Sequence, residues 1–253
     1  MSNSTATSKS LTGKVAFIQG GSRGIGAAIA KRLASEGAAV AISYANSEKQ
    51  AQKVVAEIEA AGGRALALRA DSADAALVTQ AIDTAATAFG SIDILVNNAG
   101  VLAVAPIEEF KLDDFDRTLA VNVRSVFVAT QAAVRHMSEG GRIINIGSTN
   151  ADRMPFPGGA AYAMSKSAII GLTKGLARDL GPRGITVNNV QPGPVDTEMN
   201  PDSGDFSVLM KSFIAVNRYG RAEEIASFVA YLVSAEAGYI TGASLTIDGG
   251  FAA

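Results

Sequence analysis

Short apolar runs alternate with longer Ala-rich stretches from residue 15 almost to the last residue of the sequence. The apolar runs predict strands at Val15–Gln19, Ala39–Tyr44, Arg64–Arg69, Ile92–Asn97, Arg142–Gly147, Ile185–Val190 and Ala243–Ile247. Most of these runs are apolar at successive positions rather than at every second one. We therefore expect strands that are buried on both faces of a parallel sheet.

The stretches between the runs predict helices over Gly24–Glu36, Ser47–Ala61, Ala73–Phe89, Leu112–Met137, Ala160–Leu180 and Ala222–Val233. Regular β-then-α alternation predicts an α/β fold. We expect a Rossmann-type, doubly wound sheet of about seven parallel strands with helices on both faces. No linker-like shift in composition interrupts the pattern. Residues 11–253 are therefore expected to form a single domain, and residues 1–10 a disordered tail.

One long segment breaks the alternation, between the strand that ends near Gln191 and the helix that begins at Ala222. Long excursions in compact domains are usually lids or binding loops. This one follows the carboxyl end of a strand, where such sheets bind ligands. We therefore expect a substrate lid over about residues 198–216, with an ordinary surface loop as the alternative.

Composition and charge exclude several classes of protein. Hydrophobic residues make up 48% of the chain and charged residues 18%, which excludes a disordered chain. The chain has no Cys and one His, His136, so disulfide scaffolds, thiolate catalysis and His-based metal sites are excluded. The 22 basic and 24 acidic residues are mixed along the chain and give a net charge of −2, which indicates neither a nucleic-acid nor a membrane partner. The polar residues 1–10 do not resemble a signal peptide. We expect a cytoplasmic protein that acts on small molecules and holds no metal.

A glycine-rich turn, Gly20-Gly21-Ser22-Arg23-Gly24-Ile25-Gly26, follows the first predicted strand and leads into the first predicted helix. The glycines permit a tight turn, and backbone N–H groups at a helix N-terminus can approach a pyrophosphate. In this position of an α/β chain the turn indicates a dinucleotide-binding site, with an ordinary loop as the alternative.

The end of the second predicted strand favours NADP(H) as the dinucleotide. A carboxylate about 20 residues after the glycines would bind the ribose 2′-OH of NAD. Here Ser43, Tyr44 and Asn46 supply hydroxyls and an amide instead. The Arg23 guanidinium could pair with a 2′-phosphate. The alternative is that Arg23 faces the solvent and Glu48 sets the choice of coenzyme.

Tyr162 and Lys166 are four positions apart near the start of a predicted helix, and hence lie on one face. A free phenol has a pKa of about 10. An adjacent ammonium and a cationic nicotinamide would stabilise the phenolate and lower that pKa toward neutrality. Ser148, at the carboxyl end of a predicted strand, could donate a hydrogen bond to a substrate carbonyl while Tyr162 delivers a proton.

In combination these motifs resemble those of the short-chain dehydrogenases/reductases, most closely the 3-oxoacyl-carrier-protein reductase branch and its ketone-reducing relatives. The similarity extends from Leu11 to Phe251. It rests on a series of motifs in order: the glycine-rich turn, Asp71, Asn97-Asn98-Ala99-Gly100, Asn122, Ser148, Tyr162 with Lys166, Pro192-Gly193, Thr241-Gly242 and Asp248-Gly249-Gly250.

The resemblance implies a role for each matching residue. Tyr162 would be the general acid and base, Lys166 would lower its pKa and hold the nicotinamide ribose, and Ser148 would orient the carbonyl. Asn122 would anchor a water that joins Lys166 to the solvent. The residues expected to bind the coenzyme are Gly20, Ser22, Arg23, Gly24, Ile25, Gly26, Ser43, Tyr44, Asn46, Asp71, Ser72, Asn98, Ala99, Gly100, Tyr162, Lys166, Pro192, Gly193, Val195 and Thr197. A homotetramer, or a homodimer, is also implied.

Two features depart from the family pattern. Gln19 stands where the family usually has a small Thr. Ser148 and Tyr162 are 14 positions apart, one more than is usual in this branch. The extra residue falls within 152–159, which would flank the substrate. It therefore bears more on an acyl-carrier-protein substrate than on hydride chemistry.

The residues expected near the substrate are mostly apolar and include Met154, Phe156, Met199, Phe206, Leu209, Met210 and Phe213. They suggest a medium-sized ketone or a 3-oxoacyl thioester, unless they only pack the lid onto the body. The leading hypothesis is NADP(H)-dependent, reversible reduction of such a ketone to a secondary alcohol. Bacterial relatives with stretches similar to Arg153-Met154-Pro155 and Gln191-Pro192-Gly193-Pro194 have been linked to cyclic-dinucleotide binding. A nucleotide-binding regulator with incidental turnover is therefore the alternative.

Overall fold

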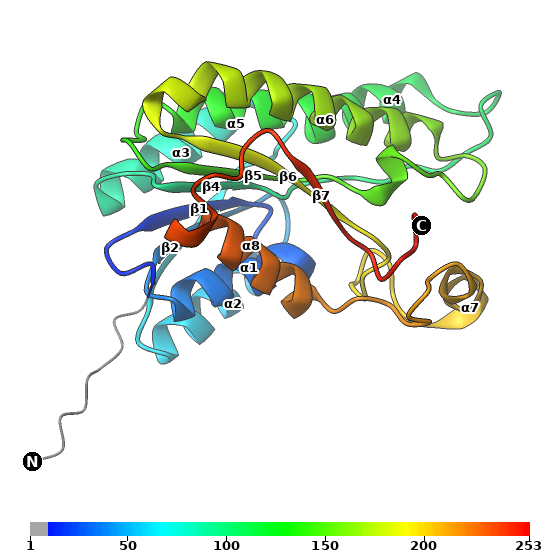
Figure 1. Cartoon of the computed structure of the whole chain (residues 1–253), viewed down its shortest axis with the longest axis horizontal. Coiled ribbons are helices and arrows are strands. Elements are labelled where there is room, and N and C mark those ends of the chain that lie inside the picture. The colour runs from blue at the N-terminus through cyan, green and yellow to red at the C-terminus, as the bar shows by residue number, and fades with distance from the viewer. Residues whose placement is uncertain (1–9) are drawn as a thin grey trace, which may run out of the picture.

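Seven parallel strands form one sheet in the order β3-β2-β1-β4-β5-β6-β7 (Figure 1). The computed structural model describes residues 10–253, so the predicted tail lies outside the described residues except for Ser10. The strands are β1 Val15–Gln19, β2 Ala39–Tyr44, β3 Arg64–Arg69, β4 Ile94–Asn97, β5 Arg142–Ile146, β6 Thr186–Pro192 and β7 Ser244–Ile247. The strand order reverses between β1 and β4, which leaves a crevice at the carboxyl ends of the strands.

Helices cover both faces of the sheet, so the predicted doubly wound fold is confirmed (Figure 1). They are α1 Gly24–Ser35, α2 Glu48–Ala60, α3 Ala75–Phe89, α4 Leu112–Leu119, α5 Ser125–Ala133, α6 Ala160–Leu180, α7 Gly204–Ser212 and α8 Ala222–Val233. Helices α1, α2 and α8 pack on one face, and α3, α5 and α6 on the other. Short 3₁₀ turns lie at Thr149–Ala151, Gly181–Arg183 and Ala235–Ala237. Within residues 10–253, no helix combines the length and the apolar character needed to cross a membrane.

Each face of the sheet has its own apolar core, and neighbouring residues of one strand enter opposite cores. Phe17 packs on one side of β1 and Ile18 on the other. Ile143 and Ile144 divide in the same way on β5. Successive side chains of a strand point to opposite faces. A strand covered on both sides can therefore be apolar at successive positions, as β1 is from Val15 to Ile18, although β6 also buries polar side chains such as Asn188 and Gln191.

The predicted helix over Leu112–Met137 is interrupted. A π-helical turn over Ala120–Arg124 separates α4 from α5, and α5 already ends at Ala133. The interruption coincides with Asn122, whose buried side chain bonds to groups outside its own helix. Such bonds favour a local widening of the helix, and π turns are frequent at functional sites.

The segment predicted as a lid, 198–216, contains a helix of its own, α7. Met210 and Ile214 form a third, small apolar cluster with Tyr219 and Phe251. In Figure 1, α7 stands apart from the two helix layers, on the side of the molecule where the chain ends. This placement, beyond the carboxyl end of β6, is compatible with a lid, and closure over a substrate stays a prediction.

Candidate active site

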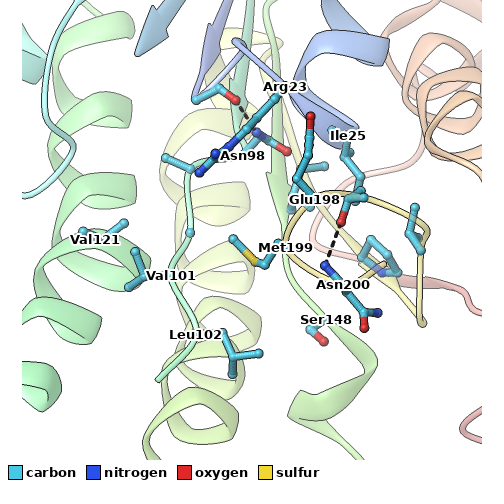
Figure 2. A pocket seen from close by; sticks show the side chains of 18 of the residues that line it. Arg23, Ile25, Asn98, Val101, Leu102, Val121, Ser148, Glu198, Met199 and Asn200 are labelled. Atoms are coloured by element: carbon cyan, nitrogen blue, oxygen red, sulfur yellow. Dashed lines mark hydrogen bonds between the residues drawn. The ribbon is translucent and has the colours of Figure 1, made fainter. Parts of the chain in front are cut away.

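A cavity of about 430 Å³ opens at the carboxyl ends of the strands. It brings together most of the site residues that the sequence predicts. Those at its wall are Gly20, Ser22, Arg23, Gly24, Ile25, Ser43, Tyr44, Asn46, Asp71, Ser72, Asn98, Ala99, Gly100, Ser148, Phe156, Tyr162, Lys166, Pro192, Gly193, Val195, Thr197, Met199, Phe206 and Met210. Figure 2 shows Arg23 and Asn98 at one end of the cavity, and Leu102 and Ser148 at the other.

Five predicted site residues do not line the cavity: Gly26, Asn122, Met154, Leu209 and Phe213. Leu209 is half exposed on α7, and Phe213 packs against the small apolar cluster around Met210. Gly26 lies in α1, where an added Cβ would be 2.4 Å from the carbonyl oxygen of Gly20. Its missing side chain therefore allows α1 to pack closely against the glycine-rich turn. Asn122 is buried behind the wall. Met154 was expected to contact the substrate, but its terminal methyl group packs against Gly159 at the start of α6. Because the loop turns at that point, Phe156 rather than Met154 reaches the cavity.

The glycine-rich turn between β1 and α1 leaves a helix N-terminus free of side-chain caps. Gly20 has φ +71°, and an added Cβ would be 2.9 Å from the Cα of Ala99, so the turn requires glycine there. Asn98 Nδ2 donates to the carbonyl of Gly20 over 2.8 Å. Arg23, at the N-cap position of α1, makes no side-chain cap, and no acidic residue lies in the first helical turn. The free N–H groups and the positive end of the helix dipole fit an anionic group such as a pyrophosphate.

Ser148 and Tyr162 come from different elements and interact at the cavity. Ser148 follows β5, and its Oγ accepts a hydrogen bond from the backbone N–H of Asn150 over 3.1 Å. Tyr162 lies in the first turn of α6. Burial raises the pKa of the Tyr162 phenol, and a hydrogen bond with Ser148 partly offsets this by lowering it. The phenol is therefore held in its protonated, proton-donating form near neutral pH.

Lys166 lies one helical turn beyond Tyr162, and its Nζ is 5.7 Å from the centre of the Tyr162 ring. The Nζ donates a hydrogen bond of 2.9 Å to the carbonyl of Ile146. Burial lowers the pKa of Lys166 to about 8. The sequence predicts that this ammonium lowers the pKa of Tyr162. In the structure, burial has the largest effect on the pKa of Tyr162 and raises it, and the group that lowers it is Ser148.

Asn122 connects the loop after β4 to α6. Its Oδ1 accepts from the N–H of Val101 over 2.9 Å, and its Nδ2 donates to the carbonyl of Val101 and to Ser165 Oγ, each over 3.0 Å. A Cβ placed on Gly100 would be 3.6 Å from both Asn122 Oδ1 and Lys166 Nζ. The polar atoms of Asn122 and Lys166 therefore flank the same glycine. The water that would join them stays a prediction.

Several residues that line the cavity were not among those predicted: Val101, Leu102, Arg117, Val121, Asn150, Glu198, Asn200 and Phe251. Some follow a recognised motif directly, as Val101 follows Gly100 and Glu198 follows Thr197, so their position next to the motif could have indicated them. Phe251 follows Gly250 in the same way, whereas Arg117 carries no such local signal. Arg117 reaches the cavity beside Asp71, from which its guanidinium is 3.6 Å distant.

Comparison with known proteins gives a match over almost the whole chain. The family model described as Enoyl-(Acyl carrier protein) reductase matches residues 20–252. The cyclic-di-GMP-binding biofilm dispersal mediator protein of Escherichia coli strain K12 is 47% identical over 242 residues, which cover 96% of this chain and 98% of that protein. The 3-oxoacyl-[acyl-carrier-protein] reductase of Synechocystis sp. strain PCC 6803 is 42% identical over 243 residues, covering 95% of this chain and 97% of that protein.

Solved structures match the fold at higher identity. A short-chain dehydrogenase/reductase from Serratia marcescens is 68% identical, with a TM-score of 0.95, over 96% of this chain and 100% of that one. A short-chain dehydrogenase from Burkholderia cenocepacia, solved in complex with NADP, is 56% identical, with a TM-score of 0.95, over the same shares of the two chains.

Proposed function

Because the chain belongs to the short-chain dehydrogenase/reductase family, as its motifs predict, we propose that it reduces a ketone or 3-oxo group to a secondary alcohol with NADP(H). One observation carries the proposal. The Tyr162 phenol and the Ser148 hydroxyl meet at the wall of the cavity, where Ser148 lowers the pKa of the phenol, and Lys166 follows one turn later on the same helix. This arrangement places a proton donor and a second hydrogen-bond donor where one carbonyl oxygen can meet both.

The cavity fits a nicotinamide dinucleotide that carries a 2′-phosphate. The uncapped N-terminus of α1 suits the pyrophosphate. Ser43, Tyr44 and Asn46 line the adenosine end without a carboxylate among them, and the exposed Arg23 lies at the same wall. Glu48, the other residue considered for selecting between NAD and NADP, does not line the cavity. The relative from Burkholderia cenocepacia that was crystallised with NADP supports the same coenzyme.

Proton transfer falls to the protein's own residues. In the direction of reduction the substrate carbonyl accepts hydrogen bonds from Ser148 and Tyr162, and the proton of Tyr162 moves to the oxygen as the alcohol forms. The bound coenzyme supplies the hydride. The pKa of Tyr162, raised by burial, keeps the phenol protonated for this step. The Ser148 hydrogen bond and the Lys166 ammonium stabilise the phenolate until a proton returns from the solvent, by way of Lys166 and the water that Asn122 would anchor.

The substrate side of the cavity indicates an apolar substrate. Phe156, Met199, Phe206 and Met210 line it, together with Leu102. Flexible Met side chains adapt to ligands of different shape, so we propose a medium-sized ketone or a 3-oxoacyl thioester. The Synechocystis relative, named a 3-oxoacyl-[acyl-carrier-protein] reductase, supports the second class. Closure of residues 198–216 over the substrate belongs to the same proposal.

We also propose that the protein is a homotetramer or a homodimer. Large apolar side chains are exposed on α4, α5 and α6: Leu112 is 77% exposed, Phe127 50% and Met164 43%. Light scattering of the purified protein measures the oligomeric state, and a monomer at micromolar concentration would contradict this proposal.

The central experiment is a panel of ketones and 3-oxoacyl thioesters, assayed with NADPH by the absorbance of the reduced nicotinamide. The wild type is expected to turn over several apolar members. Tyr162→Phe is expected to lower kcat by about 10²–10⁴-fold while the Kd for NADPH changes little. No turnover across the panel, or full activity of the Tyr162→Phe variant, would contradict the proposed reaction.

A nucleotide-binding regulator is the second candidate, because the Escherichia coli relative is named as cyclic-di-GMP-binding. Arg153, which the sequence offers for that role, is engaged inside the protein. Its guanidinium lies 5.7 Å from the ring centre of Phe213 and 5.5 Å from that of Phe251, and it donates to the Phe251 carbonyl. It would have to leave these contacts to bind a phosphate. Calorimetry with cyclic di-GMP decides: tight binding without turnover of any ketone would favour the regulator.

A further inference from the structure

Gln191 is a buried amide on β6 whose donor nitrogen is used entirely by the loop that begins at Ser148. Only 2% of its surface is exposed. Nε2 donates to the backbone carbonyl of Ser148 over 3.2 Å and to Asp152 Oδ2 over 2.8 Å. An amide nitrogen has two hydrogens, so both are engaged. The two bonds hold the first and the fifth residue of the same loop.

The partners of Gln191 also fix the direction of its amide. If the amide were reversed, its oxygen would face a carbonyl and a carboxylate, which are both acceptors. The observed direction instead gives two donor bonds, one of them assisted by the charge of Asp152. Gln191 therefore acts as a donor, and an apolar or acidic side chain of the same size could not replace it.

Neighbouring residues of β6 hold the same loop and the residue just before it. The N–H of Gly147 donates to the carbonyl of Val190 over 2.7 Å. Thr149 Oγ1 donates to the carbonyl of Pro192 over 3.2 Å. Pro192 itself lines the cavity. Gln191 lies between Val190 and Pro192 on β6. Of these three residues, Gln191 is the one that bonds to the loop through its side chain and contacts Ser148 directly.

We propose that Gln191 is a positioning residue for Ser148, an inference that rests on the proposed reaction. By holding the peptide group that follows Ser148, it fixes the direction in which Ser148 presents its hydroxyl to Tyr162. By holding Asp152 it anchors the loop just before the segment that is one residue longer than usual. The extra residue is then accommodated between Asp152 and α6, and Ser148 keeps its place.

The first test is Gln191→Leu, which has a similar size but no donor. Displacement of a group by about 1 Å can cost about 10²-fold in rate, so we expect kcat to fall by about 30–100-fold. The KM for NADPH should change by less than about 3-fold. Asn188→Leu is the matched control, because Asn188 is a fully buried amide on the same strand that bonds to Ile240 and Ala243 instead. It should lose stability and keep kcat within about 2-fold.

A double-mutant cycle separates positioning from general loosening of the fold. If Gln191 acts through Ser148, adding Gln191→Leu to Ser148→Ala should lower kcat by no more than about 2-fold further. The same 30–100-fold loss in both backgrounds, within about 2-fold, would overturn the proposal. If Gln191→Leu does not fold, Asp152→Ala serves in its place. Asp152 is exposed, and Asp152→Ala removes one of the two hydrogen bonds of the Gln191 amide nitrogen. It should lower kcat by about 3–10-fold.

A second measurement needs no substrate. The Ser148 hydrogen bond lowers the pKa of Tyr162. Gln191→Leu should therefore raise the pKa of Tyr162, as Ser148→Ala should. Ultraviolet difference absorbance of tyrosinate measures it, with Tyr162→Phe variants subtracting the other tyrosines. An unchanged pKa in Gln191→Leu would overturn the inference. If the wild type turns over no ketone but the pKa moves, the proposed reaction fails and the positioning of Ser148 stands.

Discussion

The rings of Phe156 and Phe206 meet edge to face on the substrate side of the cavity, with their centres 5.7 Å apart. Phe156 belongs to the loop before α6, and Phe206 belongs to α7. The contact therefore joins the two segments that flank the proposed substrate. Aromatic pairs of this kind contribute about 0.5–1.5 kcal/mol beyond the area that they bury. The pair holds α7 close to the cavity and forms part of its wall.

We expect Phe206→Ala to raise the KM for a medium-sized apolar ketone by about 3–10-fold, because the substrate loses an apolar wall. The kcat should change less, since Ser148 and Tyr162 are untouched. Steady-state kinetics measure both. Val208→Ala on the same helix is the control, because Val208 is 67% exposed and does not line the cavity. Equal effects of the two substitutions would contradict a role for Phe206 in binding.

We expect Gly26→Ala to weaken NADPH binding by about 10-fold or more and to lower the Tm by several degrees. The added Cβ would lie 2.4 Å from the Gly20 oxygen and 2.5 Å from Asn98 Nδ2, so the turn must open. Fluorescence titration and thermal unfolding measure the two effects. Gly181→Ala is the control, because a Cβ there meets nothing within 4 Å. Equal NADPH affinity of the two variants would show that the close packing of Gly26 against Gly20 and Asn98 is not needed for coenzyme binding.

The stability of the protein should rise with pH between about 8 and 10 because of Lys166. Burial lowers its pKa from 10.5 to about 8, so in this interval the unfolded chain holds a proton that the folded chain has released. Folding then no longer has to bury the charge of Lys166, whose surface is only 5% exposed. The free energy of unfolding should therefore increase by about 2–3 kcal/mol over this interval. Below about pH 8 the full cost of burying the ammonium is present.

Urea unfolding at pH 7 and pH 10 measures this gain, with Lys166→Met as the reference that cannot titrate. The difference in unfolding free energy between the two proteins should move in favour of the wild type as the pH rises. A difference that stays constant would show that Lys166 keeps an ordinary pKa in the folded protein.

We expect Arg23→Ala to raise the KM for NADPH by about 10–100-fold and to leave the KM for NADH within about 2-fold. The reason is the loss of a guanidinium that pairs with the 2′-phosphate. Arg23→Lys should retain part of the preference, since a point charge replaces the planar fork. A wild type that prefers NADH, or an equal loss for both coenzymes, would contradict the choice of NADP(H).

The central strands were predictable because both of their faces are buried. The predicted bounds of β1, β2 and β3 agree with the structure residue for residue, as do those of α6 and α8. β6 extends to Pro192, two residues beyond the prediction, because it continues to pair with β7 as far as Ile247. The sequence around Pro192 does not show how far the neighbouring strand β7 extends, so the end of β6 could not be predicted from it.

The site was predictable where one short motif supplies the chemistry, as Tyr162 and Lys166 do. It was not predictable where a residue's role depends on contacts with distant parts of the chain. Gln191 could be read as part of a strand, but its bond to Asp152 joins residues 39 positions apart. Arg153 likewise meets Phe251 across 98 positions. No local pattern of apolar and polar residues contains such information.

The π turn at Ala120–Arg124 preserves the angular phase between α4 and α5. Each residue of an α-helix advances the side-chain direction by about 100°, and the wider turn takes up one residue without adding that rotation. Removing a single residue here would let α4 and α5 merge into one regular helix. The faces of α4 and α5 would keep their relative direction, because the wider turn absorbs one residue, but Asn122 would be drawn away from Val101. Changes in chain length at this point therefore cannot be neutral, however well the new sequence suits a helix.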